Sequence, residues 1–118
     1  MNYTEEALGT VALFLIPELG LRDESSSGET FEKEIENFFL DKFGSCTFPG
    51  KSVIDYRLDP DKASRRRLAI SREYTVAIKD AEAVLQLKEF LARIASEMRL
   101  KSMYLEINRE AMLLTPSA

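Results

Sequence analysis

The sequence predicts an α+β domain with the element order βαββαβ, in which a four-stranded antiparallel sheet carries two helices on one face. Two segments show the apolar spacing of amphipathic helices, and four others are continuously apolar or alternate between apolar and polar residues. A chain of 118 residues fits one domain, so residues 1–118 are treated as a single unit with a short tail over 115–118.

The first strand is predicted over Thr10 to Ile16, which is continuously apolar and is followed by Pro17. Such a run is typical of a strand that is buried on both faces. The first helix is predicted from residues at helical spacing, which are Phe31, Ile35, Phe38, Phe39 and Lys42. The stretch from Ser26 to Glu29 is typical of a capping box with Ser26 as the N-cap, and Gly44 is expected at the C′ position.

The second strand is predicted within Ser45 to Leu58, interrupted by a turn or bulge over Phe48 to Lys51. Alternation predicts the third strand over Leu68 to Ile78. Asp80 is expected to cap the second helix, whose apolar side holds Val84, Leu87, Leu91, Ile94, Ala95 and Met98. Alternation from Ser102 to Met112 predicts the fourth strand.

In this element order the chain resembles small stand-alone ferredoxin-like (α/β-plait) domains of bacteria. The resemblance is one of topology, covers most of the chain, and carries no functional residue with it. It implies the split βαβ arrangement, in which the strands at Thr10 to Ile16 and Leu68 to Ile78 are central.

Composition excludes several classes of site. The chain has no histidine and one cysteine, Cys46, which excludes Ser-His-Asp and Cys-His nucleophile systems and disfavours zinc, haem and non-haem iron. A carboxylate site for magnesium or calcium stays open, but no calcium-loop motif is present, so no metal or cofactor is predicted. The N-terminus lacks the basic start of a signal peptide, and the apolar run is too short to cross a bilayer, so a cytoplasmic protein is expected.

The face of the sheet away from the helices is the expected place for function. The residues predicted to face the helices are Ile54, Tyr56, Leu58, Leu68, Ile70, Tyr74, Val76, Ile78, Met103, Leu105 and Ile107. Those predicted on the open face are Val53, Asp55, Arg57, Ser71, Glu73, Thr75, Ala77, Tyr104, Glu106 and Asn108. The first strand has no polar side, so one of its apolar triplets must point outward: Val11, Leu13 and Leu15, or Ala12, Phe14 and Ile16.

An outward apolar strip marks a contact surface. We therefore expect a homodimer that packs through the open face, and a non-catalytic role in binding a partner or a small ligand. The residues expected at a ligand pocket there are Phe14, Asp55, Arg57, Glu73, Tyr104, Glu106 and Asn108. These carboxylates and Arg57 also fit ordinary cross-strand ion pairs with no further role.

The alternative function is a cofactor-independent enzyme of the dimeric α+β barrel type. Its base would be Glu73 or Glu106, with the carboxylate partly desolvated against Phe14. A lone cysteine such as Cys46 fits a packing role better than a nucleophile. Arg72 has the helix-facing parity, which indicates either a bulge or, as we prefer, a hairpin that runs past the helices into solvent.

The run Arg65 to Arg67 raises a third function, contact with an anion or nucleic acid. The RNA recognition motif shares this topology but needs aromatic residues on the open face of its third strand. Here the outward residues are Ala69, Ser71, Glu73 and Thr75. This pattern disfavours nucleic acid as a partner, and we expect the arginines to form a solvated hairpin end facing Asp59 and Asp61.

Overall fold

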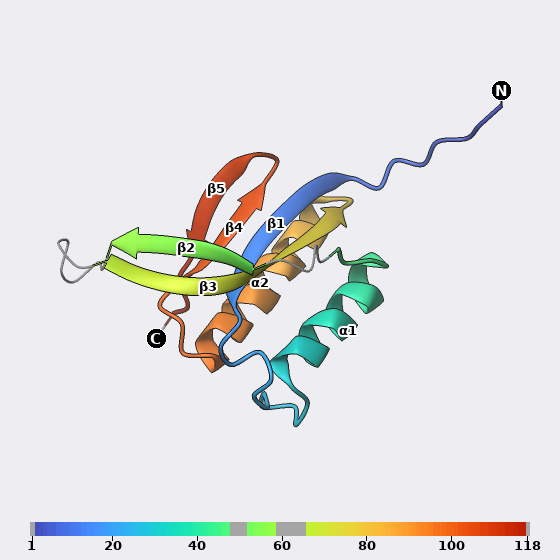
Figure 1. Cartoon of the computed structure of the whole chain (residues 1–118). Coiled ribbons are helices and arrows are strands. Elements are labelled where there is room, and N and C mark those ends of the chain that lie inside the picture. The colour runs from blue at the N-terminus through green and yellow to red at the C-terminus, as the bar shows by residue number, and fades with distance from the viewer. Residues whose placement is uncertain (1, 48–51, 59–65, 118) are drawn as a thin grey trace.

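The computed structural model describes residues 2–47, 52–58 and 66–117, with only the backbone of Arg57, Leu58, Arg66 and Arg67. These residues form an α+β fold (Figure 1). In chain order its elements are β1 (Thr10–Pro17), α1 (Phe31–Phe43), β2 (Ser52–Leu58), β3 (Arg66–Ile78), α2 (Ala81–Glu97), β4 (Met103–Ile107) and β5 (Glu110–Leu114). Within the described ranges the strands make one antiparallel sheet of order β2-β3-β1-β4-β5.

The predicted four-stranded βαββαβ order is not confirmed, because a fifth described strand follows the fourth. The segment predicted as one strand over Ser102 to Met112 is a hairpin of β4 and β5. Its turn consists of Asn108 and Arg109, whose φ angles of 52° and 67° are both left-handed. Two left-handed residues give the type I′ geometry that matches the twist of paired strands. As predicted, β1 and β3 each lie between two neighbouring strands.

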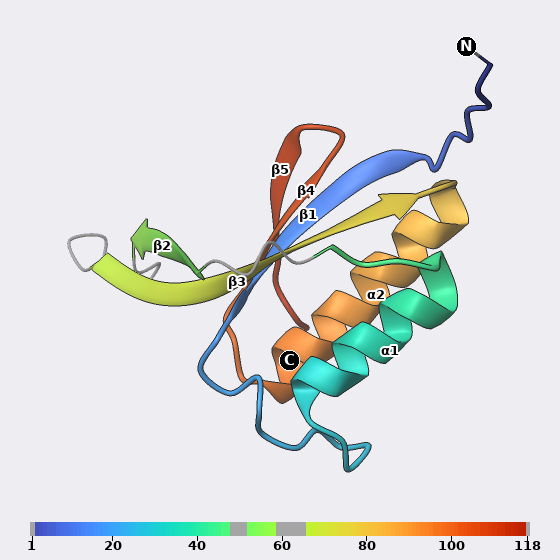
Figure 2. The same ribbon diagram turned by 45° about the vertical axis from the view of Figure 1, so that its right-hand side comes forward.

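Both helices lie on one face of the sheet (Figure 2). Of the two apolar triplets of β1, Ala12, Phe14 and Ile16 face the helices, where all three are fully buried. The Phe14 ring stacks between Phe39 of α1 and Tyr74 of β3, with centroids 5.1 and 5.2 Å away. The second triplet, Val11, Leu13 and Leu15, therefore faces the open side.

The helix ends follow the local sequence with one correction. Thr30, not Ser26, caps α1, and its hydroxyl accepts the backbone N–H of Lys33 at 3.2 Å. The serine stretch instead forms a turn before the helix, which a bridge between Glu24 and Thr30 closes. Gly44 ends α1 with a φ of 77°, and the Asp80 side chain caps α2, both as predicted.

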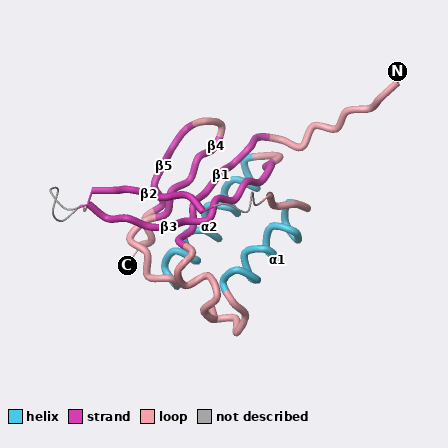
Figure 3. Tube along the Cα trace, in the orientation of Figure 1, coloured by secondary structure: helices cyan, strands magenta, loops and turns pink. Residues whose placement is uncertain are grey.

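The paired strands β2 and β3 extend beyond the helices, as the tube trace shows (Figure 3). We call Ser52–Leu58 and residues 66–70 the arm. Four of its residues have the predicted helix-facing parity, but the helices do not reach them and they are exposed: Ile54, Tyr56, Leu68 and Ile70. The side chain of Leu58, also predicted to face the helices, lies outside the described part of the structure. The turn or bulge predicted over Phe48 to Lys51 lies outside the described residues.

Candidate functional site

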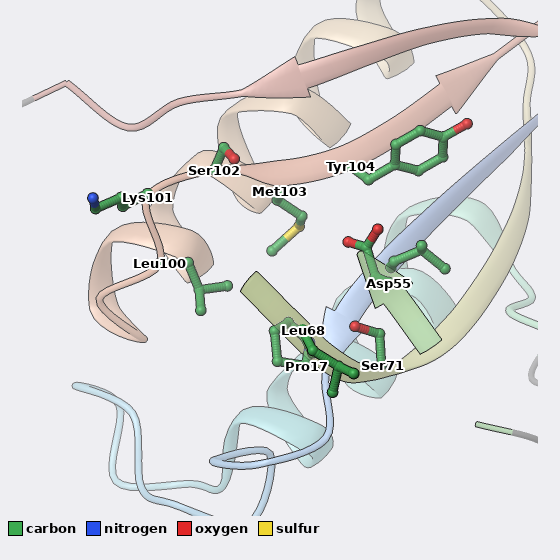
Figure 4. A pocket seen from close by; sticks show the side chains of 11 residues that line it. Pro17, Asp55, Leu68, Ser71, Leu100, Lys101, Ser102, Met103 and Tyr104 are labelled. Atoms are coloured by element: carbon green, nitrogen blue, oxygen red, sulfur yellow. The ribbon is translucent and has the colours of Figure 1, made fainter. Parts of the chain in front are cut away.

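The open face carries a hollow of about 190 Å³ between the arm and the start of β4 (Figure 4). It exists because β1 ends at Pro17, whereas β3 continues outward to Arg66. The pairing of β1 with β4 reaches only Leu15, so the start of β4 has no β1 residue beside it. The lining residues are Leu15, Pro17, Asp55, Leu68, Ala69, Ser71, Leu100, Lys101, Ser102, Met103 and Tyr104.

Polar residues line the hollow on both sides. Asp55 and Ser71 come from the arm and the adjoining part of β3, whereas Lys101 and Tyr104 come from the α2–β4 junction and β4 (Figure 4). Ser71 is only 1% exposed, although it lies on the open face of the sheet. The Tyr104 hydroxyl donates to the Glu106 carboxylate at 3.1 Å. The lining of the hollow thus combines a carboxylate, a hydroxyl and a phenol with apolar walls, whereas the Lys101 ammonium points away from them at the edge of the hollow (Figure 4).

The predicted site residues divide into three groups. Asp55 and Tyr104 line the hollow, and Glu106 joins them through its hydrogen bond with Tyr104. Glu73 faces the open side opposite Leu15 but does not line the hollow. Asn108 forms part of the β4–β5 turn and lines, with Glu106, a second hollow beside the start of β1.

The remaining predicted site residues are Phe14 and Arg57. The prediction that Phe14 lies at the site is wrong, because Phe14 is fully buried on the helix side and does not lie on the open face. The expected desolvation of Glu73 against Phe14 is therefore wrong, since the β1 residue directly opposite Glu73 is Leu15. The side chain of Arg57 lies outside the described part of the structure.

Sequence reasoning missed Lys101 and Ser102, which precede β4, and the role of Pro17. These residues become neighbours of the arm only because β1 stops between them. A weak signal was present in the stretch from Arg99 to Ser102, which is polar except for Leu100 and directly follows an amphipathic helix. Loops after secondary-structure elements often carry binding residues.

Arg72 has a structural role on the helix side. Its guanidinium forms an ion pair with Glu32 of α1 and donates to the Tyr74 hydroxyl at 3.3 Å. Burial alone would lower the pKa of Arg72. Its hydrogen bonds with Glu32 and Tyr74 raise the pKa by more than burial lowers it, so the net shift is upward. Both explanations predicted from the sequence are wrong for Arg72. The strand register shows no bulge, and the side chain contacts α1 and does not extend into solvent.

Cys46 behaves as a packing residue. It is half-buried against the core. Burial, followed by the nearby negative charge of Glu36, raises the pKa of the thiol to about 11. The sulfur is therefore protonated at neutral pH and is a poor nucleophile, in agreement with the role predicted from the sequence.

Other classes of site find no support in the described ranges. No group of three or more His, Cys, Asp or Glu residues is placed there to hold a metal ion. Neither helix described is long and apolar enough to span a bilayer. Arg65, Asp59 and Asp61 lie outside the described residues, and only the backbone of Arg66 and Arg67 is described. The solvated hairpin end expected for these arginines therefore stays a prediction.

Comparison with known proteins gives a fold and no family. No protein-family model matches the sequence, and no curated protein matches it significantly. Among solved structures, the fold is similar to a phage SAM lyase in complex with S-methyl-5′-thioadenosine, with a TM-score of 0.61. The alignment covers 98% of this chain and 95% of that chain at 10% sequence identity. The similarity shows a shared α+β architecture over nearly the whole of both chains.

Proposed function

We propose that the protein binds a small adenosine-containing sulfonium or thioether molecule in the open-face hollow. The observation that carries this proposal is that Asp55, Lys101 and Tyr104 all belong to the lining of one concave site. The similar phage structure supports the ligand class, because that lyase is named for SAM (S-adenosylmethionine) and is bound to S-methyl-5′-thioadenosine.

The lining chemistry fits this ligand class. S-adenosylmethionine carries a sulfonium, an ammonium, a carboxylate, ribose hydroxyls and an aromatic base. Asp55 attracts the cationic groups or accepts from ribose hydroxyls, and Lys101 attracts the carboxylate. The Tyr104 ring and the Leu15 side chain provide apolar contact for the base. At about 190 Å³ the hollow is smaller than most complete ligand pockets, so part of the ligand lies outside it over the sheet.

Isothermal titration calorimetry tests this proposal with S-adenosylmethionine, S-methyl-5′-thioadenosine and adenosine as probes. We expect S-adenosylmethionine or S-methyl-5′-thioadenosine to bind the wild type, and Asp55→Asn or Tyr104→Ala to weaken binding at least about tenfold, the effect of losing about 1.4 kcal/mol. Glu73→Gln is the matched control, because Glu73 shares the open face but does not line the hollow. Absence of binding by both sulfur-containing probes, or equal affinity in all variants, contradicts the proposal.

A second candidate function is cleavage of the sulfonium. The named activity of the similar phage protein favours it, as does the Tyr104–Glu106 pair beside the hollow. In such an elimination, the Glu106 carboxylate takes a proton from Cβ of the amino-acid part. The C–H electron pair forms the Cβ–Cγ double bond, and the Cγ–S pair remains on sulfur, which gives S-methyl-5′-thioadenosine and an unsaturated amino acid.

Chromatographic detection of S-methyl-5′-thioadenosine separates the two candidates. An enzyme releases it from S-adenosylmethionine faster than buffer does, and Glu106→Gln abolishes the release while S-methyl-5′-thioadenosine still binds. A protein that binds S-adenosylmethionine without any release supports the non-catalytic proposal. Release that survives Glu106→Gln shows that Glu106 is not the base.

A further inference from the structure

Four large apolar side chains project from the helix-side face of the arm. Their exposed fractions are 57% for Ile54, 62% for Tyr56, 56% for Leu68 and 52% for Ile70. The strand register pairs Ile54 with Ile70 and Tyr56 with Leu68, so the four form one continuous patch. We call these residues the arm patch.

The arm patch continues the pattern that builds the core. Further along β3, Tyr74, Val76 and Ile78 have the same parity and are at most 3% exposed, because the helices cover them. The arm passes the ends of both helices, and its equivalent residues have no covering element among the described residues (Figure 2). The same apolar alternation is thus extended over a part of the sheet that the described residues leave uncovered.

The area of the arm patch suits contact with another protein chain. At these exposed fractions each side chain leaves about 100 Å² accessible, so the four present roughly 400 Å², as large as the largest apolar patch of many monomers. A standard interface takes about 800 Å² from each partner, of which the central part is apolar. The arm patch therefore supplies about half of one side of a stable interface.

We propose that a second copy of this chain covers the arm patch. Two arms packed face to face about a two-fold axis bring Ile54, Tyr56, Leu68 and Ile70 of one copy onto the same residues of the other. Closed two-fold pairs are the commonest homo-oligomers and need such a self-complementary surface. The patch residues carry no formal charge that would repel its copy. This inference goes beyond the proposed ligand binding and does not rest on it.

The proposal replaces the open-face contact expected from the sequence. That expectation depended on the outward triplet of β1, in which Val11 is 57% exposed but Leu13 and Leu15 are half-buried. The arm patch exposes more apolar side chain and stands clear of the rest of the molecule. Burying the arm patch therefore releases more hydrophobic free energy than burying the outward triplet of β1.

Analytical ultracentrifugation over about 1–100 µM, a range in which association is concentration-dependent, tests the proposal. We expect the wild type to exceed its monomer mass of 13.4 kDa, and the double variant Ile54→Lys with Leu68→Lys to sediment as a monomer. The matched control is Leu40→Lys on α1, where the side chain is 59% exposed but stands outside the arm patch, and it should keep the wild-type mass.

Two further variants complete the test. Tyr56→Ser makes a milder change to the arm patch and should weaken association at least tenfold while the circular dichroism spectrum stays that of the wild type. Val11→Lys probes the open face and should leave the mass unchanged. A monomeric wild type over the whole range, or an assembly that Val11→Lys dissociates and the arm variants do not, overturns the proposal.

Discussion

At the residue scale, burial decides what Cys46 contributes. Its pKa is raised from 9.0 to about 11, so the folded protein holds the thiol proton more tightly than the unfolded chain does. The stabilising effect is complete below the unfolded pKa and is lost as pH rises through the window from 9.0 to about 11. Across this window, the wild type should lose more stability than Cys46→Ala, which has no thiol to ionise.

Urea unfolding at several alkaline pH values measures this difference, with the variant as the reference for other groups that titrate there. A wild type and Cys46→Ala that lose stability in parallel would show that the thiol is as accessible in the folded state as in the unfolded one. Alkylation by iodoacetamide at neutral pH provides an independent check, because a protonated, half-buried thiol should react slowly.

At the element scale, Gly9 controls how the chain enters β1. Its φ is 114°, and a Cβ at this position would collide with the backbone carbonyl of Ile78 in the neighbouring strand. Gly9→Ala should therefore cost about 2–3 kcal/mol, from backbone strain and displacement of the first strand pair. Gly28 also has a left-handed φ, of 88°, but no atom lies within 4 Å of its Cβ position.

Gly28→Ala is thus the matched control, with an expected cost of about 1 kcal/mol from strain alone. Chemical denaturation of both variants compares the two costs. Equal losses of stability would mean that the start of β1 moves away from Ile78 without penalty.

The β4–β5 turn offers a change in the stabilising direction. Arg109 adopts a φ of 67°, which a side chain opposes and a glycine accepts freely. Arg109→Gly creates the Asn-Gly pair that type I′ turns prefer and should raise the free energy of unfolding by about 0.5–1 kcal/mol. Thermal unfolding measures the gain, and a loss of stability would indicate that Arg109 makes contacts worth more than the strain.

The same turn shows what could be predicted from the sequence at this scale. The helices and the central strands follow from apolar periodicity, which depends only on local spacing. The fifth strand was missed because the turn between β4 and β5 has arginine at position 109, where a glycine would have indicated a type I′ turn. Thr30 replaced Ser26 as the N-cap because the serines are held in a separate turn, where Ser25 donates its N–H to the Glu29 carbonyl at 2.8 Å.

At the scale of the whole molecule, the candidate site depends on relations that no single segment carries. Alternation placed Asp55 and Tyr104 on the open face correctly, because parity is a local property. It could not show that Lys101 and Ser71 join them, since this follows from β1 ending at Pro17 while β3 continues. It also placed Phe14 among the candidates, because a strand apolar on both sides does not reveal which side is covered.

The two proposals concern different surfaces of the arm, which share only Leu68, and therefore predict different patterns of hydrogen exchange. A ligand in the hollow touches both sides of it, so the locally exchanging amides of Leu68 to Ser71 and of Leu100 to Tyr104 should slow together. Dilution that separates two copies should speed exchange in the arm and leave the α2–β4 junction unchanged. The loop from Arg22 to Glu29 is the reference, because it lines neither the hollow nor the arm patch. Ligand protection confined to the arm would contradict binding in the hollow, and dilution without effect on the arm would contradict association through the arm patch.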